Sequence, residues 1–180
     1  MSSIITKRGD DGSTDILFGH RVSKDSVRIE AIGAVDELNS ALGLVRVYSK
    51  DTGIIELIDD IQNDLIGLMG QLACKKKDTS RYKKKNFPSV SNDDVVKLEK
   101  LATSYSSVGM RYKDWARPGA EHSIWRAHLD FAKTIARRAE RKIITLHNKQ
   151  EEVSIDVRLY INRLSDLLWI LARSGSIAYE

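Results

Sequence analysis

Apolar residues along the chain recur mainly every three or four positions, the spacing that places side chains on one face of an α-helix. This spacing predicts helices over 28–45, 54–72, 95–105, 121–148 and 155–178. The pattern over 54–72 is the most regular and resembles the apolar seam of an antiparallel helical bundle. The sequence therefore predicts an all-α fold, a bundle of five helices.

The predicted helices are separated by polar connections. Pro88 and Pro118, the only two prolines, fall in these connections, where the missing N–H costs no helical hydrogen bond. One connection, 75–91, contains the sequence KKKDTSRYKKK, with six lysines and one arginine. We expect a solvated basic loop there, with nucleic-acid binding through the lysines as the alternative.

Length and composition favour one domain over 1–180. The chain has 180 residues, 42% of them hydrophobic, enough for one sizeable core. No apolar run is long enough to span a membrane and the first residues lack a signal-peptide core, so we expect a cytoplasmic protein. Cys74 is the only cysteine and is expected to be a small core residue.

Candidate chemistry begins on the predicted helix 121–148. Lys133, Arg137 and Arg141 are spaced by four residues and therefore lie along one stripe of that helix. Such a stripe forms an anion site if it faces a cleft, with Glu140 placed to orient Arg137. A solvated face stabilised by ion pairs is the alternative.

Two other predicted helices carry polar residues beside apolar positions. Asp36 lies next to apolar positions of the first helix and calls for a cationic partner, which helix 121–148 could supply. Asn162 either bonds a neighbouring helix or reads a nucleoside edge. It belongs to a polar stripe that is formed by Arg158, Asn162, Asp166, Trp169 and Arg173.

Several common catalytic motifs are absent from the sequence. It has no phosphate-binding GxxxxGK[ST] loop, no HExxH and no Ser/His/Asp or Cys/His arrangement that can be placed. The four histidines are scattered, and we expect surface or packing roles for them rather than metal binding. An enzyme with this composition would use a reaction that needs little proton transfer, such as one based on phosphate positioning.

Five segments of the chain, taken together, resemble a known family. These are TKRGDDGSTD, VSKDSVRIEAIGAVDELNSALG, RPGA, RRAER and INRLSDLLWILAR. They occur in the order and approximate spacing found in corrinoid adenosyltransferases of the PduO type. Each segment alone is a weak signal, whereas the ordered set is specific and spans nearly the whole chain.

The resemblance implies a five-helix bundle that forms a homotrimer and binds ATP and cobalamin between subunits. In this family the N-terminal segment, here 1–25, wraps the triphosphate of ATP. Glycine allows close backbone approach, and successive N–H groups, hydroxyls and a lysine suit an anion. The implied ATP-binding residues are Thr6, Lys7, Arg8, Gly9, Asp10, Gly12, Ser13, Thr14, Lys24, Arg137, Arg138, Glu140, Arg141 and Asn162.

The resemblance also implies a reaction and its catalytic pair. Asp36 corresponds to an aspartate that pairs with the first arginine of the ATP motif, here Arg137. The 5′-deoxyadenosyl group of ATP passes to the cobalt of cob(I)alamin and triphosphate leaves, with Mg²⁺ bound to ATP and no metal site made by the protein. Delivery of the product to an adenosylcobalamin-dependent enzyme is a further implied partnership.

The sequence departs from the family pattern in two places. In DWARPGA, Trp115 stands where many relatives have an aromatic residue near Pro-Gly, and Ala120 replaces a second glycine. Trp115 is therefore expected either to contact the corrinoid or to plug a loop. The lysine tract replaces a shorter connection. The alternative functions are a corrinoid or nucleotide carrier without catalysis and a helical protein that binds nucleic acid through the lysines.

Overall fold

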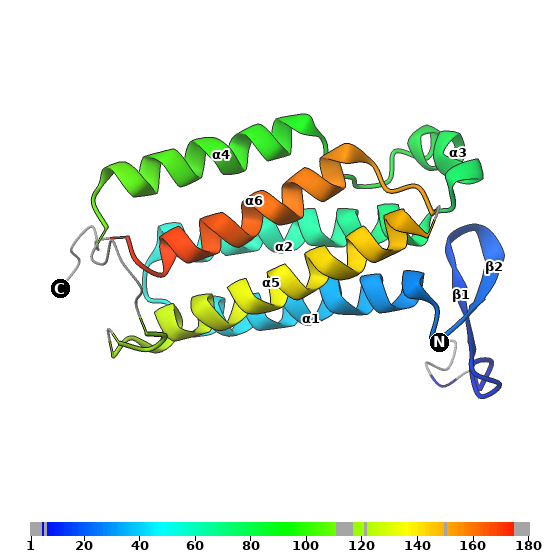
Figure 1. Ribbon diagram of the computed structural model, residues 1–180, viewed down its shortest axis with the longest axis horizontal. Coiled ribbons are helices and arrows are strands. Elements are labelled where there is room, and N and C mark those ends of the chain that lie inside the picture. The colour runs from blue at the N-terminus through cyan, green and yellow to red at the C-terminus, as the bar shows by residue number, and fades with distance from the viewer. Residues whose placement is uncertain (1–4, 6, 111–116, 121, 150, 175–180) are drawn as a thin grey trace.

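The computed structural model describes residues 5, 7–110, 117–120, 122–149 and 151–174. Five long helices run lengthwise through the molecule (Figure 1). They are α1 (Val27–Tyr48), α2 (Thr52–Ala73), α4 (Asn92–Ser107), α5 (Ile124–Asn148) and α6 (Ile155–Leu171). All five coincide with the periodic segments of the sequence, which confirms a mostly helical protein.

Four of the five long helices, all except α5, begin at a residue whose side chain satisfies a free N–H group of the first turn. Ser26 accepts a hydrogen bond from the N–H of Ile29, and Asp51 accepts one from Ile54. Ser91 begins α4 with a capping box, in which the Asp94 carboxylate accepts from the Ser91 N–H at 2.8 Å. Each such cap contributes about 1 kcal/mol, so these polar residues fix where the helices start.

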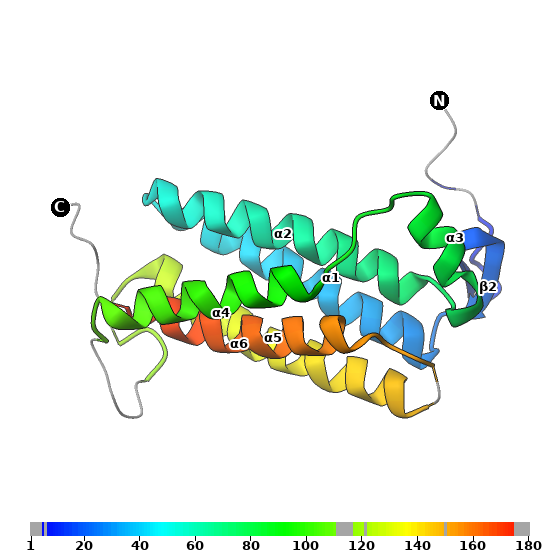
Figure 2. The same cartoon turned by 90° about the horizontal axis from the view of Figure 1, so that it is seen from above.

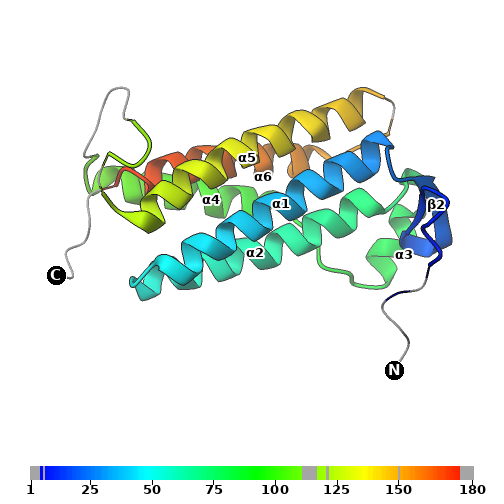
Figure 3. The same ribbon diagram turned by 90° about the horizontal axis from the view of Figure 1, so that it is seen from below.

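The helices pack around one apolar core. α1 packs against α2 and α5, and α6 packs against α5 and α4, as the perpendicular views show (Figure 2, Figure 3). Leu38, Leu65 and Ile161 are fully buried in this core. Tyr160, also fully buried, donates its hydroxyl to Asp64 at 2.9 Å, so one polar pair joins α6 to α2. Within the described residues, no helix is long and apolar enough to cross a membrane.

The N-terminal segment contains strands that the sequence reading did not predict. β1 (Ser13–Ile16) and β2 (His20–Ser23) form an antiparallel hairpin, in which Ser13 pairs with Ser23. Its tip is a 3₁₀ turn over Leu17–Gly19. The expectation of an all-α fold is therefore wrong in this detail, because two four-residue strands are too short to give a clear alternating pattern.

The lysine tract is a solvated connection between α2 and α4, as expected, but it is not a plain loop. It forms a 3₁₀ turn over Lys76–Asp78 and a short helix, α3 (Thr79–Lys84), which makes six α-helices in the described chain instead of five. Tyr82 is 5% exposed, and its hydroxyl donates to the carbonyl of Pro88. One buried aromatic side chain thus folds a tract whose composition indicates solvation.

Two helix ends and one side chain differ from expectation. α5 begins at Ile124 rather than at 121, and α6 ends at Leu171 rather than at 178. The chain turns after Leu171, and Ser174 forms an isolated antiparallel bridge with Met110, which ends the helix; 175–178 lie outside the described residues. Cys74 is only partly buried at the end of α2 and is not part of the core.

Candidate functional site

The N-terminal segment folds into tight turns that precede the hairpin. The N–H of Asp10 donates to the carbonyl of Lys7 at 3.3 Å, and that of Gly12 donates to Gly9 at 3.2 Å. Gly12 has a φ of 81°, in the left-handed region that glycine adopts without strain. The N–H of Lys24 donates to the carbonyl of Gly12 at 2.9 Å, which joins the two ends of the segment.

Gly9 and Lys24, both predicted to contact ATP, lie against each other. A Cβ atom built on Gly9 would come within 2.9 Å of the Lys24 ammonium nitrogen. Glycine at this position leaves room for the ammonium group beside the turn, and a larger residue would displace it. Lys7 and Lys24 are both exposed, so two cations border this turn.

Arg21, which the sequence reading missed, organises the side chains of the segment. Its guanidinium donates to Asp11 and to the carbonyl of Arg8, at 3.2 Å and 2.9 Å, and also to the hydroxyl of Ser13. Ser13 donates to Asp11 at 2.7 Å, and these hydrogen bonds, with that from Ser13 first, hold the pKa of Asp11 below its ordinary value. Arg8 pairs with Asp15 at 3.0 Å. No spacing in the sequence indicates this network around Arg21. Thr14, another predicted ATP residue, is partly buried on β1.

The arginine-rich stretch of α5 divides its side chains between two kinds of surroundings. Arg137 and Arg141 are exposed, and neither forms an ion pair within the described residues. Arg138 instead pairs with Glu37 of α1, so it holds two helices together. Lys133, the third member of the predicted stripe, bonds Asp130 at 3.1 Å.

Glu140 orients Asn162, whereas the sequence reading paired Glu140 with Arg137. The amide of Asn162 donates to the Glu140 carboxylate at 2.9 Å, across α5 and α6. The oxygen of the same amide accepts from Arg163 at 2.7 Å, which fixes its orientation. Two predicted site residues that are far apart in the sequence are thus brought into direct contact.

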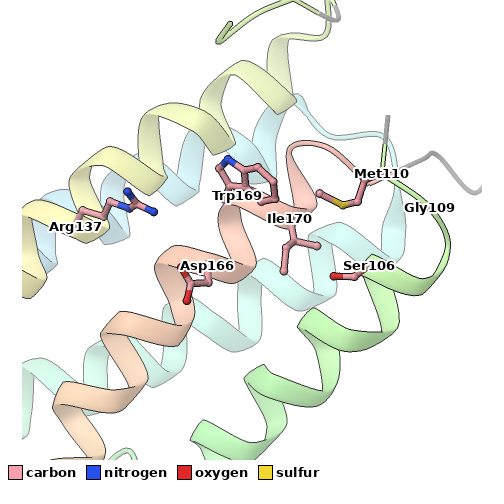
Figure 4. Close-up of a pocket in the computed structure, with 7 residues that line it drawn as sticks. All are labelled: Ser106, Gly109, Met110, Arg137, Asp166, Trp169 and Ile170. Carbon is pink, nitrogen blue, oxygen red and sulfur yellow. The ribbon is translucent and has the colours of Figure 1, made fainter. Parts of the chain in front are cut away.

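A pocket of about 680 Å³ opens beside Arg137. Arg137 comes from α5, Asp166 and Trp169 from α6, and Met110 lies just beyond the end of α4 (Figure 4). The bridge between Met110 and Ser174 closes the wall formed by the chain after α4. The complete lining is Ser106, Gly109, Met110, Arg137, Asp166, Trp169 and Ile170. An arginine and an aromatic wall in one pocket suit an anion and a flat apolar group.

Trp169 is held from behind by buried charges. The guanidinium carbon of Arg173 lies 4.7 Å from the Trp169 ring centroid, and Arg173 also donates to the Trp169 carbonyl at 3.1 Å. Asp130, 7% exposed, accepts from both Arg173 and Lys133, at 3.0 Å and 3.1 Å. Trp169 was not among the site residues predicted from the sequence, although it belongs to the polar stripe of this helix. Its spacing of seven residues from Asn162 places both on one helix face and could have indicated its role.

Within one chain, the predicted ATP residues do not form one compact site. The hairpin lies at the end of the bundle where α1 begins and α5 ends, whereas α4 and α6, whose last turns line the pocket, end towards the other end (Figure 1). From Arg137 to the last residue of α5 at Asn148, a rise of 1.5 Å per residue gives about 16 Å.

Asp36 is exposed on α1 and forms no ion pair with Arg137 in this chain. Thr6 and Trp115 lie outside the described residues.

The described residues contain no group of three or more His, Cys, Asp or Glu side chains that could hold a metal ion. Three of the four histidines have side-chain contacts of another kind. His20 bonds Asp78 at 2.6 Å, His128 stacks on Tyr48 with ring centroids 5.2 Å apart, and His147 accepts from the N–H of Val153. These are packing and positioning contacts.

Comparison with known proteins places this geometry in a family. The family described as Cobalamin adenosyltransferase matches residues 4–174. A corrinoid adenosyltransferase of Bacillus subtilis is 36% identical over 190 residues, covering 98% of this chain and 92% of that protein. The corrinoid adenosyltransferase PduO of Citrobacter freundii is 34% identical but longer, and the match covers 96% of this chain and 49% of PduO. The chain thus spans about half the length of that relative.

Solved structures agree with the sequence comparison. A variant of the PduO-type ATP:corrinoid adenosyltransferase from Lactobacillus reuteri, complexed with cobalamin and ATP, has a TM-score of 0.84 at 32% identity, over 95% of this chain and 92% of that one. Another variant of that enzyme, complexed with ATP, has a TM-score of 0.82 at 31% identity, over 94% and 92%. The resemblance drawn from the sequence motifs is confirmed, and the chain belongs to the cobalamin adenosyltransferase family.

Proposed function

We propose that this protein transfers the 5′-deoxyadenosyl group of ATP to the cobalt of cob(I)alamin. The observation that carries the proposal is the match over 95% of the chain to a structure that holds both cobalamin and ATP. The electron pair of Co(I) forms the Co–C bond with carbon 5′, while the C–O bond breaks and its electrons leave with triphosphate. No proton has to be removed, so the reaction requires no general base.

ATP binding is assigned to the residues named from the sequence. The exposed Arg137 and Arg141 are available for the triphosphate, and the exposed Lys24 ammonium lies beside the turns over 7–12. Asn162 is already oriented by Glu140 and presents a fixed amide to the nucleoside. These groups stabilise the developing charge of the leaving group and align carbon 5′ with cobalt.

Mg²⁺ is proposed to enter with ATP. This ion is commonly bound through one or two carboxylates and the substrate phosphates, without a dedicated protein cage. The exposed carboxylate of Asp10, in the turn beside Gly9 and within the proposed triphosphate segment, fits this mode of binding.

The corrinoid is assigned to the pocket beside Arg137. Trp169, Met110 and Ile170 give it an apolar wall suited to a flat macrocycle. Trp115 is proposed to contact the lower face of the corrin and exclude water from cobalt. A hydrophobic loop plug remains the alternative role for Trp115.

We further propose a homotrimer with sites between subunits. Two observations support it. Exposed apolar side chains gather along the adjacent helices α1 and α5, where Val47 is 72%, Ile124 is 60% and Phe131 is 53% exposed. In addition, the hairpin lies at one end of the bundle, and the last turns of α4 and α6, which line the Arg137 pocket, lie towards the other end (Figure 1), so a neighbouring subunit can unite the two. Asp36 of one subunit then pairs with Arg137 of the next.

Three further assignments concern the domain, its location in the cell and the recipient of the product. The chain is proposed to act as one domain over 1–180 in the cytoplasm, where ATP and cellular reductants are supplied. An adenosylcobalamin-dependent enzyme is the proposed recipient of the product.

One assay tests the proposed function. Purified protein is mixed with Mg-ATP and chemically reduced cobalamin, and the light-sensitive Co–C product is followed by absorbance. The wild type should form it with release of triphosphate. Arg137→Ala should lower kcat/KM by one to two powers of ten, because a charge-assisted contact contributes about 1.5 to 3 kcal/mol.

Lys142→Ala is the matched control. Lys142 lies on the same helix and pairs with Glu30 at 2.8 Å, outside the proposed site. This variant should turn over normally. Binding of ATP and corrinoid without product in the wild type would indicate a carrier, and full activity of a folded Arg137→Ala protein would refute the role given to Arg137.

A further inference from the structure

The tip of the N-terminal hairpin packs against the lysine tract. The Phe18 ring stacks on the Phe87 ring with centroids 6.2 Å apart, and the Arg81 guanidinium carbon lies 4.4 Å from the Phe18 centroid. Beside them, the His20 ring nitrogen and the Asp78 carboxylate are 2.6 Å apart. Three residues of the connection 75–91, Asp78 and Arg81 in the lysine tract and Phe87 just after it, therefore contact the hairpin from one side. We refer to these three as the clasp.

The clasp is itself fixed to the helical bundle. Tyr82, on α3 between Arg81 and the following lysines, is 5% exposed and hydrogen bonds the carbonyls of Gly67 and Pro88. Its ring packs edge-on against Phe87 with centroids 5.2 Å apart. A Cβ atom on Gly67 would come within 3.0 Å of the Pro88 backbone, so this glycine lets the tract lie directly on α2. The tract is thus held against α2 and can fix the position of the hairpin tip that packs on it.

The hairpin needs such a support. It consists of two four-residue strands, and an isolated two-stranded hairpin of this kind is marginally stable in water. Its tip also holds Phe18 at a φ of 64°, a left-handed conformation that a bulky residue keeps only where its surroundings impose it. The contacts of Phe18 with Arg81 and Phe87 are the surroundings that hold this conformation.

The strand register connects the tip to the proposed nucleotide segment. Ile16 pairs with His20 at the tip, and Ser13 pairs with Ser23 at the other end, next to the turns over 7–12. Because the ladder is only four pairs long, fixing His20 and Phe18 also restricts Ser13 and Gly12. A restricted segment loses less conformational freedom when ATP binds, which raises the affinity.

We propose that the clasp of the lysine tract positions the N-terminal segment for ATP. Asp78, Arg81 and Phe87 are positioning residues, because they act through the hairpin and do not touch ATP. This inference rests on the proposed function, in which the N-terminal segment binds the triphosphate. It gives the basic tract a defined role within the enzyme.

The test combines an exchange measurement with kinetics. Arg81→Ala and Asp78→Ala remove one contact each, and Lys84→Ala, on an exposed residue of the same short helix, is the control with the same charge change as Arg81→Ala. Amide hydrogen exchange over 13–23 should accelerate in the two clasp variants and stay unchanged in the control. The KM for ATP should rise roughly 2- to 5-fold in Arg81→Ala, the loss expected for an exposed cation–π contact. Changes in kcat and in the KM for corrinoid should stay within about twofold.

Two variants of the segment itself separate the inference from the proposed function. Lys7→Ala and Ser13→Ala alter groups proposed to contact the triphosphate. If they raise the KM for ATP while both clasp variants leave it unchanged, the clasp has no positioning role and the inference is refuted alone. If none of the four variants changes the KM, the segment does not bind ATP and the proposed site is wrong as well. Unchanged exchange over 13–23 in both clasp variants also refutes the inference.

Discussion

Asp130 is the most informative residue for testing how the pocket is built. Its carboxylate, 7% exposed, accepts hydrogen bonds from two cations, Arg173 at 3.0 Å and Lys133 at 3.1 Å. Arg173 is 4% exposed, and its Nε has no hydrogen-bond partner among the described residues. The charge of Asp130 is therefore the main compensation for a guanidinium that is buried behind Trp169.

Asp130→Asn keeps the size of the side chain but removes this charge. Removing one partner of a buried ion pair typically costs about 3 to 5 kcal/mol, because the other charge stays buried without compensation. For a chain of this length, each kcal/mol lowers Tm by about 2 to 4 °C. We therefore expect Tm to fall by roughly 6 to 20 °C while the protein still folds at 25 °C.

Urea unfolding and thermal unfolding measure this change, with Asp60→Asn as the control. Asp60 pairs with Lys97 at 2.9 Å on the surface, where a pair contributes at most about 1 kcal/mol. Arg173→Met combined with Asp130→Asn should cost less than the sum of the single changes, since it also removes the uncompensated charge. If Asp130→Asn costs no more than the control, Arg173 is not held by Asp130 and the reasoning is wrong.

Three further predictions concern pH, assembly and the corrinoid. Burial, as the largest cause, raises the pKa of Asp64, so its stabilising contribution is complete below about pH 4 and is lost as the pH rises through the raised value. Asp64→Asn keeps an oxygen for the Tyr160 hydroxyl but does not titrate. Its free energy of unfolding, measured by urea titration, should therefore rise relative to that of the wild type as the pH increases from 4 to 8, and a difference that does not change with pH would contradict this. Asp36→Asn should weaken both ATP binding and trimer formation, measured by ATP titration and sedimentation, whereas an intact trimer with unchanged affinity would exclude the pairing with Arg137. Trp115→Ala should slow adenosylation from cob(II)alamin more than from cob(I)alamin. The wild type with ATP and cob(II)alamin should show the spectrum of four-coordinate cobalt, which has no lower ligand, and the variant should lose it. A variant with lower Tm that keeps this spectrum would mark Trp115 as a loop plug.

The positions of the long helices were predictable from the sequence alone. The periodic segment 54–72 became α2, Thr52–Ala73, because an apolar face of that length can be buried only as a helix against other helices. The family was also readable, since its motifs are ordered along the chain and involve residue types suited to phosphate. Neither inference required knowledge of which helices touch.

Residue pairs in the site depended on tertiary packing. The contact between Glu140 and Asn162 exists because α5 and α6 lie side by side, whereas spacing along α5 predicted a partner for Glu140 on its own helix. The network of Arg21 likewise depends on a hairpin that brings residues of both strands together. Periodicity describes one helix face at a time and contains no information on the facing element.

The lysine tract shows most clearly the difference between what local sequence determines and what tertiary packing determines. Its composition indicates a solvated loop, and only the burial of Tyr82 against α2 turns it into a helix that supports Phe18. One buried aromatic ring contributes about 1.5 to 3 kcal/mol, enough to outweigh the weak local preference of a short charged segment. Local sequence therefore determined the helices that bury a whole face, while tertiary contacts decided the short elements, because these cannot bury enough surface without a partner.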